Sequence, residues 1–299
     1  MSVRILQFGT TGQVARELLR NAPDYDVEIT ALSRAECDFT DPELAARLVF
    51  QTRPDLVIVA AAYTAVDQAE SERELVYEIN AETPAAIAGV CGEEGPALVH
   101  FSTDYVFDGD KGSPYVEDDP TNPVNSYGEF KLSGERMVLI RPRTLVLRTS
   151  WVVSSHGKNF VKTMLRLAQG DQPIRVVDDQ FGRPTAAADL ARFVLSQAQR
   201  LTDAKAGDPV FGLFHFANAG EVSWKGFAEA VFDLALGDKA PSVEAITTAQ
   251  RPTPARRPVR GTLDTGKLTR VFGVTPRPWR AALAEIVADL KAEQGTPVA

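Results

Sequence analysis

The sequence VRILQFGTTGQVA, residues 3–15, decides the fold. Val3–Phe8 is an apolar run of strand length, and a helical pattern follows the glycine-rich turn. Gly9 suits the tight turn, and Gly12 lets a ligand approach the helix N-terminus, where free N–H groups and the helix dipole favour an anion. Ala15 takes the third small position and adds one methyl where helix meets strand. The pattern predicts a dinucleotide site that contacts Gly9, Gly12, Gln13 and Val14.

Strands and helices continue to alternate through the N-terminal half. We expect strands at Val27–Leu32, Leu56–Ala60, Ala97–Phe101 and Leu145–Ser150. Between them we expect helices from Asp41-Pro42 to Thr52, around Val76 and Ile79, and from Pro84 to Glu93. Such alternation calls for an α/β fold with a doubly wound parallel sheet, Rossmann-like, with right-handed crossovers.

The pattern becomes less regular after Trp151. We expect helices at Asn159–Ala168, Ala187–Gln199, Trp224–Leu236 and Trp279–Lys291, strands at Ile174–Val177 and Gly212–Ala217, and a loop at Asp179–Thr185. A proline- and arginine-rich stretch, Arg251–Arg260, reads either as a phosphate-facing segment or as an extended solvated one. The expected division is a dinucleotide-binding domain at 1–152, completed by about 186–212, and a smaller α/β substrate lobe at 153–185 and 213–299.

Residues after the second and third strands add to the cofactor site. Arg34 stands where an NAD site usually places a carboxylate for the ribose hydroxyls, and an arginine there suits a 2′-phosphate. A solvated loop charge is the alternative. Asp38 and Phe39 could flank the adenine. Small residues at the carboxyl end of the third strand mark where α/β sheets bind ligands. These are Ala61 and Ala62, followed by Tyr63.

A hydroxyl pair, Ser102 and Thr103, follows the strand expected at Ala97–Phe101, and Tyr127 and Lys131 come later in the chain, four residues apart. If Asn125 or Ser126 caps a helix, the phenol and the ammonium group share one helix face. A nearby cation would lower the phenol pKa toward working pH, and Thr103 could hold a carbonyl oxygen beside it. The set predicts ketone reduction, although tyrosine and lysine also occur at this spacing by chance.

Composition limits the partners. The 299 residues carry a formal net charge of −8, which argues against general nucleic-acid or anionic-membrane binding. No apolar run approaches the ~18 residues of a membrane span, and the N-terminus lacks a signal-peptide profile, so we expect a cytoplasmic protein. Cys37 and Cys91 form no metal or redox motif, and the three histidines are scattered. Small-molecule partners are expected.

Several longer motifs carry a family resemblance along nearly the whole chain. They are GTTGQVA at Gly9–Ala15, CDFTD at Cys37–Asp41, AAAYTAVDQAES at Ala60–Ser71, STDYVFDG at Ser102–Gly109, YGEFKLSGE at Tyr127–Glu135, RTSWV at Arg148–Val152, DQFGRPT at Asp179–Thr185 and RPTPARRP at Arg251–Pro258. The chain resembles the extended short-chain dehydrogenase/reductase family, and within it the branch that reduces dTDP-linked 4-keto-6-deoxy sugars.

The resemblance implies roles for particular residues. Thr103, Tyr127 and Lys131 would be catalytic, Trp151 would line the sugar pocket, and Asp104, Tyr105 and Arg183 are expected to contact the substrate as well. NADPH is the expected cofactor, with NADH left open because the resemblance does not settle Arg34. Members of the family can bind Mg²⁺ at a dimer contact. Both the metal and a homodimer stay open here.

Two other functions remain as alternatives. Sugar-nucleotide dehydratases share the turn and the Tyr/Lys pair but usually carry Asp-Glu after the catalytic threonine. Here Asp104 is followed by Tyr105, which disfavours elimination. Reduction of another nucleotide-linked 4-keto-6-deoxy sugar and a non-catalytic, dinucleotide-binding regulatory subunit both remain open.

Overall fold

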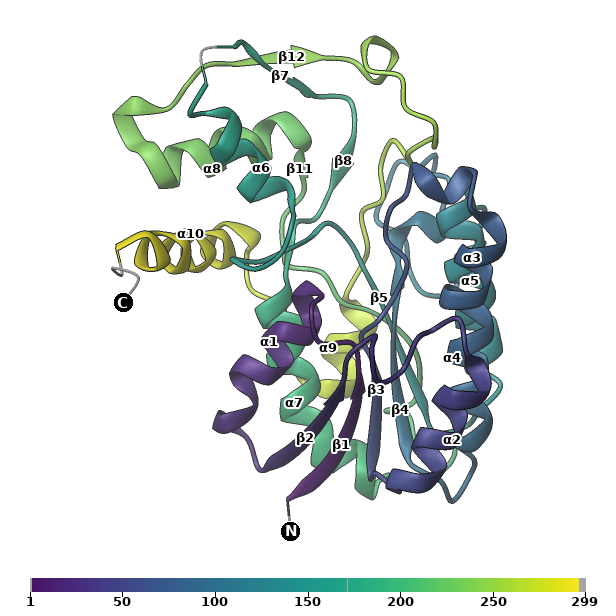
Figure 1. The fold of residues 1–299 in the computed structure, drawn as a ribbon. Coiled ribbons are helices and arrows are strands. Elements are labelled where there is room, and N and C mark those ends of the chain that lie inside the picture. Colours follow the sequence, from purple (N-terminus) through teal and green to yellow (C-terminus); the bar gives the residue numbers. More distant parts are fainter. Residues whose placement is uncertain (1, 171, 296–299) are drawn as a thin grey trace.

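The computed structural model describes residues 2–170 and 172–295, and its centre is a parallel sheet (Figure 1). The strands are β1 (Val3–Phe8), β2 (Val27–Leu32), β3 (Leu56–Val59), β4 (Ala97–Thr103), β5 (Thr144–Thr149) and β10 (Gly212–His215). They lie in the order β10-β5-β4-β3-β1-β2 and every pairing is parallel. The order reverses at β1, so the carboxyl ends of β1 and β3 border the crevice where such sheets bind ligands. The predicted doubly wound fold is confirmed.

Helices cover both faces of the sheet (Figure 1). One face packs against α1 (Gln13–Asn21), α7 (Ala187–Asp203) and α9 (Gly266–Phe272), and the other against α2 (Pro42–Thr52), α4 (Thr83–Val90) and α5 (Ser126–Val138). Successive strand residues point to opposite faces, so Val99 belongs to the first core and Leu98 to the second. Burial on both faces explains why the strands read as continuous apolar runs.

The predicted helix starts are confirmed by their caps. The Asp41 carboxylate accepts a hydrogen bond from the Leu44 amide at 2.8 Å, with Pro42 as the first residue of α2. Asn125 accepts from the Gly128 amide at 2.8 Å at the start of α5, and this decides between the two caps proposed for that helix. Each cap satisfies one of the N–H groups that a helix leaves free at its start.

The segment between β3 and β4 differs from the expectation. The short helix α3 (Arg73–Tyr77) runs into a π-helical turn, Glu78–Glu82, before α4. The predicted helix to Glu93 ends at Val90. The π turn places Asn80, which is buried, in contact with the backbone after β3, and hydrophobic periodicity does not report such a turn.

A smaller lobe lies beyond the carboxyl ends of the strands (Figure 1). It contains α6 (Phe160–Leu167), α8 (Trp224–Leu236) and α10 (Trp279–Gly295) around its own apolar core. Three short strand pairs complete it: β6 (Val152–Val153) with β9 (Thr185–Ala186), β7 (Ile174–Val177) with β12 (Val243–Ile246), and β8 (Phe181–Gly182) with β11 (Val222–Ser223). The expected loop at Asp179–Thr185 therefore contains β8 and the first residue of β9. Two-residue strands have no periodicity that could have predicted them.

Two later elements join the main sheet. β10, predicted as Gly212–Ala217, pairs with β5, and α9, which the sequence did not predict, adds Leu268 and Phe272 to the core on the α7 side. The helix α10 connects the lobe to the sheet, since Asp289 pairs with Arg20 of α1. None of the helices within the described residues is long and apolar enough to cross a bilayer.

Candidate active site

The turn after β1 packs closely against the segment that follows β3, which leaves no room for a side chain at its first glycine. Gly9 has φ +97°, and an added Cβ there would come within 3.1 Å of the Ala61 amide nitrogen and 3.2 Å of the Ala61 Cβ. Gly12 precedes α1 with no side-chain cap, so the first N–H groups of this helix are not used by a capping side chain. Ala15 is fully buried, so its methyl is accommodated. The binding of a pyrophosphate by this turn stays a prediction.

The residues after Gly12 also connect the two parts of the molecule. The Gln13 side-chain amide donates to the Val152 carbonyl at 3.1 Å, and its oxygen accepts from Asn159 at 3.0 Å. Val14 packs against the core between α1 and α7. The side chains of Gln13 and Val14 thus have structural partners. Their backbone N–H groups are the parts that lie at the turn.

Arg34 lies on the surface beside Asp38, with its Nε 3.2 Å from a carboxylate oxygen. The arginine side chain is 78% exposed, so a phosphate could reach it. The ring of Phe39 is only 6% exposed and packs 5.6 Å from the ring of Phe8. Phe39 belongs to the core on the α2 side of the sheet, and a contact of its ring with an adenine stays a prediction.

The segment after β3 is held in place by a buried asparagine. Asn80 accepts from the Tyr63 amide at 2.9 Å and donates to the Tyr63 carbonyl at 3.0 Å, while the Tyr63 phenol donates to Glu72 at 2.7 Å. The carboxyl end of β3, with Ala61 and Ala62, is thereby fixed beside Gly9. Asn80 was not among the predicted site residues, although a polar residue among the apolar positions of a helical segment can indicate such a buried contact.

Thr103, Asp104 and Tyr127 meet at the carboxyl end of β4. The Thr103 hydroxyl donates to Asp104 at 3.2 Å and accepts from the Tyr105 amide at 3.2 Å. The Tyr127 ring meets that of Tyr105 edge-on at 5.8 Å, and the Thr103 hydroxyl is near enough to the phenol to oppose the rise in its pKa. Gly128 permits this approach, because a Cβ there would lie 2.1 Å from the Tyr105 carbonyl oxygen. A shared role of the Thr103 and Tyr127 hydroxyl groups on one carbonyl oxygen stays a prediction.

The electrostatics of this group differ from the expectation. Burial, with a smaller effect of the nearby Asp104, raises the pKa of Tyr127 to about 12. Burial likewise raises the pKa of Asp104 to about 7. The predicted lowering of the phenol pKa by Lys131 is wrong, because burial raises this pKa and the hydroxyl of Thr103, not the ammonium group of Lys131, opposes the rise.

Lys131 instead lies against a histidine. Its Nζ is 3.4 Å from His100 Nε2, and the lysine is only 3% exposed. Burial lowers the pKa of Lys131 to about 8, partly opposed by Glu135, and lowers the pKa of His100 well below its usual value. At neutral pH the histidine is therefore uncharged and the lysine keeps its proton. Sequence reasoning missed His100, although a histidine inside the apolar run of β4 could have been noticed.

A buried ion pair lies below the lysine on the same helix face. Glu135, four residues after Lys131, accepts two hydrogen bonds from Arg148 of β5 at 2.5 and 2.9 Å and one from Ser102 at 2.8 Å. These contacts connect α5, β4 and β5. The Ser102 hydroxyl is therefore structural, which leaves Thr103 as the hydroxyl of this pair for the proposed site.

The lobe contributes Trp151 and Arg183. Trp151 has φ +47°, and its indole stacks on Trp224 with ring centroids 3.4 Å apart. Arg183 makes no ion pair with any described residue, its Nε is buried without a partner, and burial lowers its pKa. Arg257, by contrast, is bound to Asp67 at 2.5 Å, which explains how the proline-rich stretch is held. Of these arginines, Arg183 retains the capacity to bind a phosphate.

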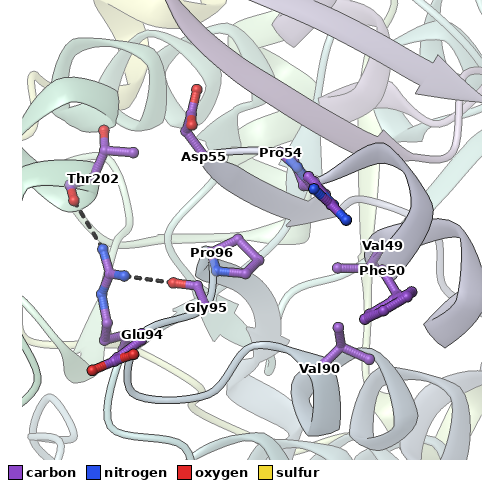
Figure 2. A pocket seen from close by; sticks show the side chains of 11 residues that line it. Val49, Phe50, Pro54, Asp55, Val90, Glu94, Gly95, Pro96 and Thr202 are labelled. Atoms are coloured by element: carbon purple, nitrogen blue, oxygen red, sulfur yellow. Dashed lines mark hydrogen bonds between the residues drawn. The ribbon is translucent and has the colours of Figure 1, made fainter.

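A pocket of about 410 Å³ opens at the opposite edge of the sheet, below the amino ends of β3 and β4 (Figure 2). The Arg143 guanidinium that lines it already donates to the carbonyls of Gly95 and Thr202. None of the expected site residues lines this pocket. In the described part of the chain, no group of three or more His, Cys, Asp or Glu side chains is placed to hold a metal ion.

Comparisons with known proteins agree with this geometry. A family model described as "RmlD substrate binding domain" matches residues 3–292. The dTDP-4-dehydrorhamnose reductase of Burkholderia thailandensis is 42% identical over 298 residues, which cover 96% of this chain and 99% of that protein. The crystal structure of a dTDP-4-dehydrorhamnose reductase from Clostridium acetobutylicum superposes with a TM-score of 0.89 at 35% identity, covering 96% of this chain and 99% of the other.

A second solved structure adds the cofactor of a relative. The dTDP-4-dehydrorhamnose reductase of Bacillus anthracis, solved in complex with NADP, has a TM-score of 0.89 and 33% identity, and the match covers 97% of this chain and all of that one. Similarity of this extent over nearly the full length, in sequence and in fold, shows descent from a common ancestor. The chain belongs to the dTDP-4-dehydrorhamnose reductase family.

Proposed function

We propose that this protein reduces the C4 ketone of dTDP-4-dehydro-L-rhamnose to dTDP-L-rhamnose with NADPH, in nucleotide-sugar synthesis for cell-surface polysaccharide. The observation that carries the proposal is the position of Tyr127 and Lys131 on α5 beside β4, the strand that ends at Thr103. A non-catalytic regulatory subunit would have no need to keep these groups together. The family membership supports the same reaction.

The cofactor residues follow from the shape of the turn. Gly9, Gly12 and the first N–H groups of α1, at Gln13 and Val14, would hold the pyrophosphate. Arg34 would bind the 2′-phosphate, and Asp38 would accept from the adenine amine. Ala61, Ala62 and Tyr63 would border the dinucleotide, with Lys131 on its nicotinamide ribose. When bound, the nicotinamide supplies the hydride.

The chain's own groups handle the oxygen and the proton. The Thr103 hydroxyl would hold the ketone oxygen, and the Tyr127 phenol would protonate it as charge develops. The high pKa of Tyr127 keeps this proton in place until then. When Asp104 is neutral, no full negative charge competes for the hydroxyl proton of Thr103. Lys131 has two N–H groups beyond its contact with His100, which leaves donors for ribose hydroxyls.

The substrate would bind between the sheet and the lobe. Asp104 and Tyr105 would lie beside the reacting oxygen, Trp151 would border the sugar, and Arg183, whose buried Nε has no hydrogen-bond partner, would meet the diphosphate. We further propose that the cofactor domain comprises residues 2–152 and α7, as expected from the sequence, and also β10 and α9, because these pack on the main sheet. The protein could also form a homodimer, and light scattering would measure its mass in solution.

Two assays test the proposal. Purified protein should oxidise NADPH only when a dTDP-4-keto-6-deoxy sugar is added, and the product should be dTDP-L-rhamnose by comparison with a standard. A different epimer at C4, or faster reduction of another nucleotide sugar, would reassign the substrate. NADPH binding with no turnover of any such sugar would favour the regulatory alternative.

Cofactor choice is tested by Arg34→Ala. We expect the wild type to prefer NADPH, and the variant to lose most of that preference, because a charge-assisted contact is worth ~1.5–3 kcal/mol. The readout is kcat/KM for each cofactor. Arg47→Ala, which removes an exposed arginine of α2, is the matched control and should keep the preference. Equal use of both cofactors by the wild type would contradict the role of Arg34.

A further inference from the structure

The indole of Trp151 is enclosed in a way that its proposed role at the sugar does not explain. Its plane lies at 7° to that of Trp224, with the centroids 3.4 Å apart, so one face of the ring is covered by the second indole. Trp224 is the first residue of α8 and lies about seventy positions further along the chain. No sequence motif joins the two tryptophans.

The other face is covered by Gly182. A Cβ built on this glycine would lie 2.4 Å from Trp151 Cε2 and almost equally far, 2.7 and 2.8 Å, from Nε1 and Cζ2. Near equality of the two outer distances, with both longer than the first, places that position above the ring and not beside its edge. Gly182 and the Trp224 ring cannot share one face, because both are in van der Waals contact with the same ring atoms. The indole is therefore held between them.

The two sides of this clamp come from segments that are joined by strand pairing. Gly182 pairs with Val222 in the antiparallel β8–β11 pair, and Trp224 follows β11 directly (Figure 1). Ser223, between them, caps α8 by accepting from the Gly226 amide at 3.0 Å. The Phe160 ring packs on the Trp224 ring, with the two centroids 4.6 Å apart, and helps to hold Trp224 in place. The spacing of the clamp is thus set by strand pairing and a helix cap.

The backbone of Trp151 explains why a clamp is useful. A residue other than glycine with φ +47° is in the left-handed region, which costs free energy that the surroundings must offset. The Thr185 amide donates to the Trp151 carbonyl at 3.1 Å, which fixes the backbone but not the side chain. The side chain is fixed by the stack and by the absence of a Cβ at Gly182.

We propose that Trp224 is a positioning residue for substrate binding: with Gly182 it holds the Trp151 indole so that an edge of the ring, and not a face, meets the nucleotide sugar. The proposal rests on the proposed function for the identity of the ligand. A sugar that stacked on the indole would first have to displace Trp224. An edge contact leaves the clamp intact during binding.

The clamp is measured directly, without turnover. Two stacked indoles produce an exciton couplet in the far-ultraviolet circular dichroism, and the chain has three tryptophans. We expect the couplet in the wild type, its loss in Trp224→Phe and in Trp224→Ala, and its retention in Trp279→Phe, the control, since Trp279 packs on Phe227. The couplet should persist when dTDP-L-rhamnose saturates the protein. Its disappearance on saturation would mean face stacking and would overturn the proposal.

Binding completes the test. Trp224→Ala should weaken dTDP-L-rhamnose about 3- to 10-fold, in line with the loss of one aromatic contact, while the Kd for NADPH stays unchanged. Trp224→Phe should restore most of the affinity, because a phenyl ring can cover the same face. Gly182→Ala should weaken the sugar nucleotide even if Trp224→Ala folds poorly. Unchanged affinity in these variants, or equal loss for both ligands, would overturn the positioning role. Binding without turnover by the wild type would refute the proposed reaction alone.

Discussion

Two groups of ionisable residues in this molecule differ in burial and in ion pairing. In the proposed catalytic corner, Thr103, Asp104 and Lys131 are buried and Tyr127 is half-buried, and none of the ionisable groups forms an ion pair with a described residue. The junction cluster, Asp189, Arg192, Arg277 and Glu285, joins α7 to α10, and every member is paired. Burial without pairing moves pKa values toward neutrality, to about 7 for Asp104 and about 8 for Lys131. Pairing moves the pKa of Glu285 to about 2.

The difference separates groups that can exchange protons from groups that hold parts together. A carboxyl or ammonium group near its pKa changes charge at little cost, which suits a site where protons move. A carboxylate with its pKa near 2 stays charged under all ordinary conditions, which suits a fixed contact between the lobe and the sheet. Similar residue types therefore serve two purposes, decided by their partners.

The largest expected effect comes from removing the proton of the catalytic corner. Tyr127→Phe keeps the ring that packs on Tyr105 but loses the acid, so kcat should fall by ~10²–10⁴ while NADPH binding survives. Steady-state kinetics with the dTDP-4-keto sugar and a fluorescence titration with NADPH give the two values. Tyr77→Phe, which removes a phenol outside the corner, is the control and should leave kcat unchanged. Wild-type kcat in Tyr127→Phe, with the chemical step rate-limiting, would refute the assignment.

The sequence predicted the sheet and most of the corner because both depend on short-range patterns. Val3–Phe8, the glycine turn and the cap of α5 at Asn125 are local signals, and the four-residue spacing of Tyr127 and Lys131 places both on one helix face. The place of Thr103 at the end of β4 follows from strand length.

Other features depend on contacts between distant segments. The stack of Trp151 on Trp224 and the bond from Asn80 to Tyr63 join residues whose meeting no local pattern reports. The pKa of Tyr127 could not be predicted either, because spacing places a cation nearby but does not reveal how completely the phenol is removed from water. The same limit applies to Phe39, whose ring belongs to the core.

Asp104→Asn should change how stability depends on pH. The folded pKa, about 7, is above that of an unfolded aspartate, so the native state binds the proton more tightly. The stability from this group is complete below pH ~4 and is lost as the pH rises to about 7, by roughly 4 kcal/mol at most. Urea unfolding of both proteins between pH 5 and 8 should show a smaller loss for the variant. Parallel curves would mean that Asp104 is ionised in the folded protein throughout.

Glu285→Gln should have the smallest effect and the opposite sign. Hydrogen bonds from Arg192, then from Arg277, lower the pKa of Glu285, against the effect of burial. The folded pKa is below the unfolded one, so the contribution is present above pH ~4.3 and is lost as the pH falls toward 2. Because the carboxylate is partly exposed, screening reduces the expected loss to about 1 kcal/mol at pH 7, and less in high salt.

The value of kcat in Glu285→Gln tests whether the junction cluster only holds the lobe on the sheet. Glu285 touches none of the proposed catalytic groups, so Glu285→Gln should unfold at lower urea and still turn over at the wild-type rate. Glu229→Gln, which breaks an exposed pair with Lys225 on α8, is the matched control and should cost less stability, since its carboxylate has one partner and Glu285 has two. If Glu285→Gln lowered kcat without lowering stability, the junction cluster would be acting on the orientation of the lobe. The contrast between holding and reacting groups would then fail at this contact.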